Sequence, residues 1–415
     1  MRWDSLLFCL LVAAAALQCQ APPGGRPDQA GSAVDAQRLE GLDKVFERAI
    51  AAKEMVGGVI LVEHRGRTIY RKAFGHRALK PQSEPMTPGT IFDMASLTKV
   101  LVTATSVMLL VEEGRLSLTD RVSTYLPEFA AGERGCRQGT EKSCVTLLHL
   151  LTHYSGLRPD IDWKEYWSGY ETAIRTGLAE VLRSAPGEQF VYSDIGFFLL
   201  GEVVRRVSGK TLEEFSQERI FAPLGMKDTG FRPGPHLLPR IAPTEARHHH
   251  DPAAPQSEDG QMMRGRVHDP STDRMGGLSG HAGLFSTVDD TARYARMILN
   301  GGELDGVRIL SPLSIRAMTT AQSPAGKPAR RGLGFDIDSP YSTVRGDLFP
   351  VGSFGHTGFT GTSLWIDPET QTFVILFTSR LHPDGQGNVV SLRKKVASVV
   401  AASLRGISPW EARKR

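Results

Sequence analysis

Several features that would place this chain in other protein classes are missing from its sequence. There is no Gly-x-Ser-x-Gly segment, so the strained turn that presents the nucleophile of an α/β-hydrolase is not predicted. No glycine-rich loop leads into a lysine and a helix, so nucleotide chemistry has no support. Charges of the two signs nearly cancel at +4 and form no long basic stripe, so no nucleic-acid partner is expected. What remains is a 415-residue chain that is 40% hydrophobic, enough for a sizeable core.

The N-terminal segment predicts export. Arg2 precedes an apolar run at 6–17 that is too short to span a bilayer and contains small residues suited to signal cleavage. We expect a signal peptide or a lipoprotein signal at 1–21; in the second case a lipid on Cys19 would attach the protein to a membrane. Residues 22–33 are rich in Pro, Gly and Gln and predict a flexible linker. We expect no later segment to be long and apolar enough to cross a membrane.

Cysteine is scarce, and its positions favour one disulfide. Cys9 lies inside the expected signal and Cys19 at its end, which leaves Cys136 and Cys144 in a polar loop with seven residues between them. In an exported protein such a pair is a natural disulfide. Two unrelated thiols are the alternative, and no zinc site is expected because further ligands are missing from the loop.

Hydrophobic periodicity predicts strands near both ends of the chain and helices between them. Strands at 57–64 and 68–74 around a turn at Arg65-Gly66 predict a hairpin, and helices are predicted first at 34–55, from helical spacing, and last at 389–404. The other predicted elements are strands at 334–337, 353–358, 363–366 and 372–378 and helices at 96–113 and 195–207.

This order of elements indicates an α+β fold, an α/β sandwich. We expect one antiparallel β-sheet made from both termini and flanked by helices, with a mainly helical domain inserted at about 95–274. The folded domain is predicted at 34–405, followed by a charged tail at 406–415.

The first motif with chemical meaning is Ser96-Leu97-Thr98-Lys99 at the start of an apolar helix. Residues three apart lie on the same helix face, so the lysine amine can reach the serine hydroxyl. A neighbouring base that takes its proton makes serine a nucleophile. The same pattern recurs at Ser391 to Lys394 on a charged helix, where it is interpreted as chance.

The second motif, Tyr192-Ser193-Asp194, stands just before a predicted helix. Tyr192 could take or relay the serine proton, and the Asp194 carboxylate could bond the lysine or a substrate amide. Ser193 or Asp194 could also simply cap the helix, and the two interpretations are compatible.

The third motif, His356-Thr357-Gly358, lies in a predicted strand and is followed by Phe359. Gly358 would let a substrate backbone approach, Thr357 could hydrogen-bond a substrate carboxylate, and His356 could add a charge or a donor. The alternative is an ordinary strand followed by a bend.

Two histidine groups raise the alternative of a metal site. Residues 248–251 read His-His-His-Asp, and His268 and Asp269 follow, but a solvent-exposed loop is favoured there. His149 and His153 are four apart, as ligands on one helix face are, but a structural role is favoured for them.

The three motifs resemble the S-x-x-K, Y-x-N and K-T-G elements of the class C β-lactamase and D-alanyl-D-alanine carboxypeptidase family of serine hydrolases. The resemblance spans about 34–404 and implies a β-lactamase/transpeptidase-like fold. Residues 264–270 resemble the penicillin-binding protein 4B relatives, a weak carboxypeptidase group. Further matching segments lie at 92–96, 147–157, 192–201, 221–226 and 280–287.

The resemblance implies an acyl-enzyme mechanism that needs no metal or organic cofactor. Ser96 would attack a carbonyl, Lys99 and Tyr192 would share the proton transfers, and the backbone amides of Ser96 and Phe359 would form the oxyanion hole. Two departures stand out. Asp194 replaces the usual Asn, and His356 replaces the commonest Lys, which argues against strong β-lactamase activity.

The resulting hypothesis is an exported serine hydrolase of the periplasm or cell envelope. Its substrates would be D-alanyl peptides, β-lactams or related amides and esters, so its partner is a small molecule or a peptidoglycan peptide. Asp194, His356, Thr357, Gly358 and Phe359 would bind the substrate. A carboxylesterase of the same fold and a non-catalytic cell-wall binding protein are the alternatives, and the oligomeric state is left open.

Overall fold

A computed structural model describes residues 33–162, 164, 166–246 and 261–407. All of them except Ala33 belong to the compact unit Val34–Arg415. The expected signal, the linker up to residue 32, Cys9, Cys19, the 248–251 histidine segment and the tail from 408 lie outside the described residues.

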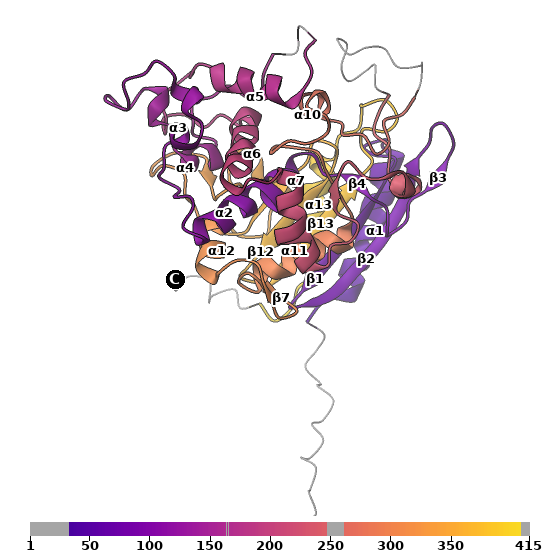
Figure 1. Ribbon diagram of the computed structural model, residues 1–415. Helices are drawn as coiled ribbons and strands as arrows, with labels where there is room; N and C mark the ends of the chain where they lie inside the picture. The colour runs from indigo at the N-terminus through magenta and orange to yellow at the C-terminus, as the bar shows by residue number, and fades with distance from the viewer. Residues whose placement is uncertain (1–32, 163, 165, 247–260, 408–415) are drawn as a thin grey trace, which may run out of the picture. The chain divides into compact units, whose positions relative to one another are not determined.

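Strands from the two ends of the chain form an eight-stranded antiparallel sheet in the order β3-β2-β1-β13-β12-β11-β10-β9 (Figure 1). The register of its centre pairs Gly58 with Thr378 and Ser363 with Leu376, so the earliest long strand lies beside the last. The sheet expected from both termini is therefore present. Its strands are β1 (Gly57–His64), β2 (Arg67–Ala78), β3 (Glu84–Pro85), β9 (Arg330–Arg331), β10 (Asp336–Asp338), β11 (Phe354–Thr357), β12 (Ser363–Asp367) and β13 (Thr372–Thr378).

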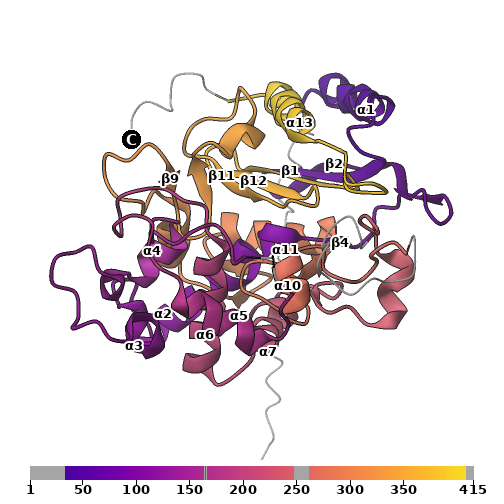
Figure 2. The same ribbon diagram turned by 90° about the horizontal axis from the view of Figure 1, so that it is seen from above.

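Helices cover both faces of this sheet, which explains why every residue of β1 is buried. Successive side chains point to opposite faces. Ile60 and Val62 pack with α1 (Ala36–Ala51) and α13 (Val390–Ser403), the two helices that lie together on one face in Figure 2. Val59 belongs to the larger core on the other face.

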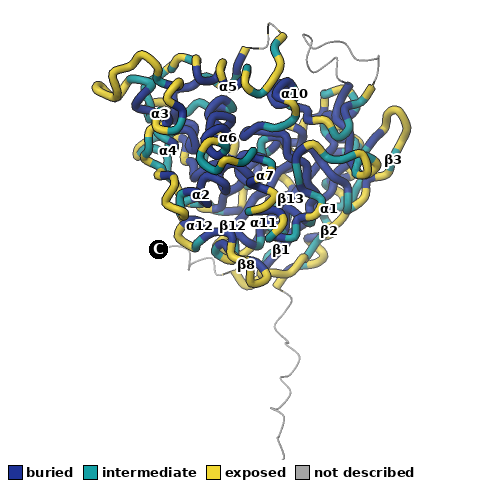
Figure 3. The backbone as a smooth tube through the Cα atoms, viewed as in Figure 1, coloured by how far each residue is buried: buried dark blue, intermediate teal, exposed yellow. Residues whose placement is uncertain are grey.

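The other face carries the helical region, whose core is buried in Figure 3. Two of its helices, α11 and α12, follow position 274, where the predicted insertion ended, so the helical part of the chain is longer than expected. A small sheet, β4-β6-β5, was also not predicted; its strands have two or three residues, too few for a period-two pattern. The described α-helices here are α2 (Thr105–Glu112), α3 (Val122–Tyr125), α4 (Leu147–Leu151), α5 (Tyr170–Ala179), α6 (Asp194–Ser208), α7 (Leu212–Ser216), α8 (Ala222–Leu224), α10 (Pro270–Arg274), α11 (Val288–Leu299) and α12 (Pro312–Thr319). Its short strands are β4 (Phe92–Asp93), β5 (Gly230–Phe231), β6 (Leu284–Ser286), β7 (Glu303–Leu304) and β8 (Val307–Arg308), and tighter or wider turns occupy Ala95–Leu97, Lys99–Ala104, Pro127–Ala130, Lys142–Cys144, Gln217–Phe221, Pro235–Arg240 and Ser342–Arg345.

The helix that begins at the first motif corrects one sequence expectation. Ala95–Glu112 has 18 residues and a mean hydropathy of 1.5, so by length and composition it could cross a membrane. However, 83% of it is buried inside the protein. A helix that is apolar on all sides and enclosed by other elements is a core helix of the folded unit.

Candidate active site

The candidate nucleophile sits on a strained turn between β4 and the core helix. Ala95 has φ +45°, a left-handed conformation that a non-glycine residue adopts only when its surroundings impose it. The buried Asp93 carboxylate imposes it by accepting a hydrogen bond from the Ala95 N–H (2.8 Å) and a second one from the His268 N–H (2.6 Å). Ser96 follows, and it lines the cavity described below.

The partner lysine is completely buried beneath the serine. Lys99 Nζ donates to Ser96 Oγ (3.1 Å) and to the His281 carbonyl (3.1 Å), and it lies 2.5 Å from Asp194 Oδ1. Burial lowers the pKa of Lys99, but the Asp194 carboxylate and Tyr192 outweigh burial and raise it above the ordinary value. Lys99 is therefore an ammonium ion at neutral pH.

The second motif both caps α6 and lines the site, so its two interpretations coexist. Ser193 Oγ accepts the Gly196 N–H (3.3 Å) at the start of the helix. Its own N–H donates to His153 Nδ1 (3.0 Å), and the His153 ring stacks on Tyr192 at 4.3 Å. The Lys99 Nζ lies 5.0 Å from the centre of the Tyr192 ring. Burial raises the pKa of Tyr192, against the opposing influence of Lys99, so the phenol is neutral at rest.

Asp194 occupies a different place from the other predicted substrate-binding residues. Its carboxylate contacts Lys99, and it is not among the residues that line the cavity. The sequence left open whether this carboxylate bonds the lysine or a substrate amide. The structure shows the contact with the lysine.

A second layer of charges lies behind the lysine, and the sequence assigned no role to it. The buried His281 donates from Nε2 to Asp269 Oδ1 (2.8 Å), because a carboxylate can only accept, and the His281 carbonyl accepts from Lys99 Nζ. Burial lowers the pKa of His281, but Asp269 outweighs burial and raises it. Burial, Asp194 and Asp269 together raise the pKa of Asp160 to about 7. His281 lies in a segment that matched the family, which was the signal available for it.

The third motif forms the opposite wall of the site. His356 Nδ1 donates to the Thr357 carbonyl (2.8 Å), because a carbonyl can only accept, so Nε2 carries no proton on the neutral ring. Within the described part of the chain, Nε2 has no hydrogen-bond partner. Burial and the charges of Arg331 and Lys99 hold the pKa of His356 well below its usual value. The ring is therefore neutral and offers an acceptor.

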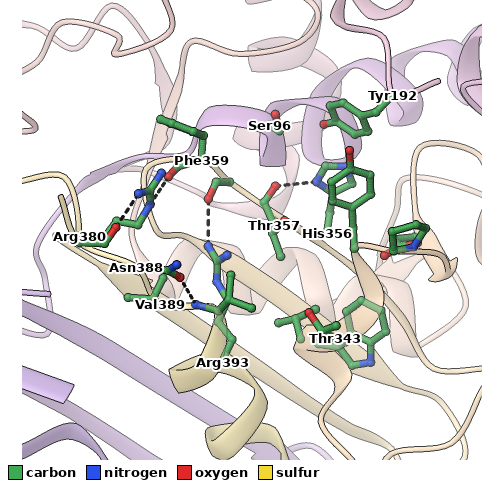
Figure 4. A pocket seen from close by; sticks show the side chains of 18 of the residues that line it. Ser96, Tyr192, Thr343, His356, Thr357, Phe359, Arg380, Asn388, Val389 and Arg393 are labelled. Atoms are coloured by element: carbon green, nitrogen blue, oxygen red, sulfur yellow. Dashed lines mark hydrogen bonds between the residues drawn. The ribbon is translucent and has the colours of Figure 1, made fainter. Parts of the chain in front are cut away.

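These residues meet at a cavity of about 610 Å³, which contains Ser96, Tyr192, His356 and Thr357 (Figure 4). Arg331, Arg380 and, on α13, Arg393 also line it. Its mouth is apolar and open to solvent, with exposed side chains from three separate segments: Tyr341 (48%), Phe359 (64%) and Val390 (52%).

Gly358 lets the wall approach the nucleophile turn. A β-carbon there would lie 2.5 Å from the Met94 carbonyl oxygen, which no side chain tolerates. Within the described residues, the backbone N–H groups of Ser96 and Phe359 donate to no acceptor. Two unpaired donors at the edge of a cavity can stabilise an oxygen that acquires negative charge.

Other residues singled out in the sequence lie away from this site. Cys136 and Cys144 are joined in a disulfide. Glu141 lies close enough to complete a three-residue metal-ligand group with them, but sulfurs bonded to each other supply no thiolate. His149 Nδ1 accepts the N–H of Thr146, the capping residue of α4, which is a structural role.

A family model described as Beta-lactamase matches residues 42–397. A protein of Escherichia coli O157:H7, whose name assigns it provisionally to the D-alanyl-D-alanine carboxypeptidases, is 30% identical over 86% of this chain and 85% of its own length. A protein of Bacillus subtilis (strain 168) named N-acetylmuramyl-L-alanine amidase is 30% identical over 83% of this chain and 82% of its own.

Solved structures share the fold. EstCE1, a hydrolase with promiscuous acyltransferase activity, matches with a TM-score of 0.70 at 23% identity and covers 88% of this chain and 99% of its own. A class C beta-lactamase matches with a TM-score of 0.68 at 20% identity, over 90% and 99% of the two chains. A penicillin-binding protein homologue from Pyrococcus abyssi reaches 0.66 at 24% identity, over 88% and 77%. These matches confirm the α+β fold expected from the sequence.

Proposed function

The chain belongs to the beta-lactamase family of serine hydrolases, and from this we propose that it cleaves D-alanyl amide bonds of peptidoglycan peptides through an acyl-enzyme on Ser96. The observation that carries the proposal is the position of Lys99 Nζ, in hydrogen-bond contact with Ser96 Oγ and in ionic contact with Asp194. A binding protein without catalysis has no need for a buried lysine held against a serine. The names of two relatives, a carboxypeptidase and an amidase, both describe amide bonds of peptidoglycan peptides.

The contacts of Lys99 define the proton path. As Ser96 Oγ forms a bond to the substrate carbonyl carbon, its O–H bond breaks and the proton passes to Lys99 Nζ. Before it can accept this proton, Lys99, an ammonium ion without a lone pair, must release one of its own. Asp194 Oδ1, at 2.5 Å, is placed to receive it. Tyr192, whose ring centre lies 5.0 Å from Lys99 Nζ, can pass its phenolic proton to the departing amine and take a proton from Lys99 in return.

The remaining steps use the cavity wall. The carbonyl oxygen becomes an oxyanion next to the N–H groups of Ser96 and Phe359, the carbon–nitrogen bond breaks, and the amine leaves with its new proton. Water then attacks the ester carbonyl and releases the acid. Because His356 is neutral, it attracts a substrate carboxylate less than a lysine would, so we expect β-lactams to acylate Ser96 slowly.

The proposal is tested by the products released from two defined muropeptides. One reports release of D-alanine from a D-alanyl-D-alanine terminus, and the other reports cleavage of the muramyl–L-alanine amide. We expect D-alanine release and, with a fluorescent penicillin, a mass adduct on the protein. Ser96→Ala should lose both while keeping its fold by circular dichroism. A variant as active as the wild type would overturn the assignment of Ser96.

A carboxylesterase is the second candidate, and the cavity mouth favours it. Tyr341, Phe359 and Val390 expose apolar surface around the nucleophile, and such surface suits an apolar acyl or alcohol group. A panel of aryl and alkyl esters separates the two candidates. Ester turnover that depends on Ser96, without release of D-alanine from the muropeptide, would replace the peptidase proposal by the esterase.

We also propose that the protein is exported, with Cys19 as the site of a lipid if the signal is of the lipoprotein type. The Cys136–Cys144 disulfide supports an oxidising compartment. Fractionation of cells that produce the full chain, followed by intact mass of the mature protein, tests this. Protein that stays in the cytosol with its N-terminal segment uncleaved would contradict the proposal.

A further inference from the structure

The turn that follows β11 is fixed by hydrogen bonds to its backbone carbonyls, and one of the donors is a residue outside the three motifs. Gly358 and Gly361 close this turn through a hydrogen bond from the Gly361 N–H to the Gly358 carbonyl (3.1 Å). The turn packs on the nucleophile strand as well. Thr360 Oγ1 donates to the Asp93 carbonyl (2.6 Å), so the turn and the Ser96 segment are tied together.

Both carbonyls that flank the Phe359 N–H accept hydrogen bonds from arginines (Figure 4). Arg393 Nη2 donates to the Gly358 carbonyl at 2.9 Å, and Arg380 Nε donates to the Phe359 carbonyl. The N–H of Phe359 lies between them in the chain and has no acceptor within the described residues. The turn therefore has both of these carbonyls fixed, while the Phe359 N–H is free within the described residues.

The Arg393 contact determines where that free donor points. The Gly358 carbonyl and the Phe359 N–H belong to one planar trans peptide, in which C=O and N–H point in opposite directions. A donor bound to the oxygen on one side therefore fixes the N–H on the other. It also polarises the peptide, because hydrogen bonds in a chain strengthen one another, and a charged donor does so more than a neutral one.

An arginine is an unusual residue for a purely structural contact with two backbone carbonyls. Its side chain is buried, its Nη2 bridges the Gly358 and Thr362 carbonyls, and within the described residues it has no carboxylate partner. Burial, together with the charge of Arg380, lowers its pKa to about 9, so the guanidinium is still charged at neutral pH. An uncompensated buried cation is costly, and a neutral amide could hold two carbonyls without that cost.

We infer that Arg393 is a positioning residue of the oxyanion hole, which aims and polarises the Phe359 N–H toward the oxygen of a substrate bound to Ser96. The inference rests on the proposed acyl-enzyme function and adds the residue that sets its transition-state stabilisation. Arg393 does not touch the reacting atoms; it acts through the Gly358–Phe359 peptide.

The test compares acylation by an aryl ester of N-acetyl-D-alanine with acylation by the matching thionoester. Sulfur is a weaker hydrogen-bond acceptor than oxygen, so the ratio of the two rates reports the strength of the oxyanion hole. Acylated protein is counted by intact mass, so misfolded molecules do not contribute to the rate. The variants are Arg393→Gln, Arg393→Lys and, as a control on the same helix, Lys394→Gln, whose side chain is 49% exposed.

We expect Arg393→Gln to slow acylation by the oxo ester roughly tenfold to a hundredfold and to slow the thionoester less, so that the ratio falls several-fold. Arg393→Lys keeps the charge and should lose less, and Lys394→Gln should match the wild type. An unchanged rate ratio in the arginine variants would overturn the inference even if both rates fall, because a general loss of structure affects both esters alike. If Arg393→Gln does not fold, the ratio measured for Arg393→Lys decides. A wild-type protein that is acylated by neither ester would instead refute the proposed function itself.

Discussion

Replacing Asp194 by Asn tests whether the carboxylate controls Lys99. At an effective dielectric constant of about 20, unit charges at the Nζ–Oδ1 distance of 2.5 Å attract by about 7 kcal/mol. The Asn amide keeps one hydrogen bond to the lysine, and the fully buried ammonium is left without its counter-ion. We therefore expect the free energy of unfolding to fall by about 3 kcal/mol at neutral pH.

The sign of the pH dependence follows from the pKa of Lys99. That pKa is raised on folding, so its contribution to stability is complete below the ordinary value of 10.5 and is lost as the pH rises through the folded value. In Asp194→Asn, burial acts without the carboxylate and lowers the pKa of Lys99. The difference in stability between the two proteins should therefore be largest near neutral pH and shrink in alkaline solution.

Activity should respond to the same change. In the wild type Asp194 takes the proton that the Lys99 ammonium releases. In Asp194→Asn that acceptor is missing, and only a lysine that is already neutral can take the serine proton, so the acid limb of the acylation rate should move to higher pH. The assays are urea unfolding and the acylation rate, both as functions of pH. Asp347→Asn is the matched control, because it removes an exposed Lys–Asp pair (2.8 Å, with Lys394) and should change stability by less than about 1 kcal/mol. A stability difference that is independent of pH, together with an unmoved acid limb, would refute the reasoning.

Three further predictions concern groups around the site. Burial and neighbouring carboxylates raise the pKa of Asp160 to about 7, so ionisation of this group lowers the free energy of unfolding as the pH rises from 3.8 toward that value. Asp160→Asn should therefore be more stable than the wild type by roughly 3–4 kcal/mol at pH 8 and equal to it at pH 4. Urea unfolding measured across this pH range would contradict the prediction if the two stability profiles were parallel. A β-carbon in Gly358→Ala would lie 2.1 Å from Thr362 Oγ1, so the turn must shift; we expect at least about a tenfold slower acylation, and a rate within about twofold of the wild type would show that the turn is not rigid. Removing the disulfide by Cys136→Ser with Cys144→Ser opens a loop with a sequence separation of 8 and should lower the free energy of unfolding by about 2.5 kcal/mol in the chain-entropy account, with no effect on acylation; a Tm equal to that of the wild type would contradict the prediction.

The sheet was predictable because its strands are regular and strongly patterned. β1 and β13 each contain a continuous apolar run, at 59–62 and 373–377, and the turn at Arg65-Gly66 marks the hairpin that joins β1 and β2. The order of elements indicated a sheet made from both termini, but the pairing of β1 with β13 is known only from the structure. The end of the helical region was not predictable, since α11 and α12 are single amphipathic helices whose place depends on what they pack against.

The serine and lysine could be placed from sequence alone, since a spacing of three on a helix brings two side chains together whatever surrounds them. The same holds for the cap at Ser193, which is a local interaction. The contact of Asp194 with Lys99 was one of two options, and only the packing of α6 against the core helix brings this carboxylate to the lysine.

Local chemistry was thus determined by the sequence: which residues carry reactive groups, which of them share a helix face, and where helices and strands begin. Tertiary structure alone decided the electrostatics. The raised pKa of Lys99, the neutral state of His356 and the carbonyl-bound guanidinium of Arg393 each depend on groups from distant segments and on the exclusion of water. Coulomb interactions and desolvation act through space, so Lys99 and Arg393, which lie nearly three hundred positions apart, both lower the pKa of His356. No pattern along the chain records that these groups are close in space.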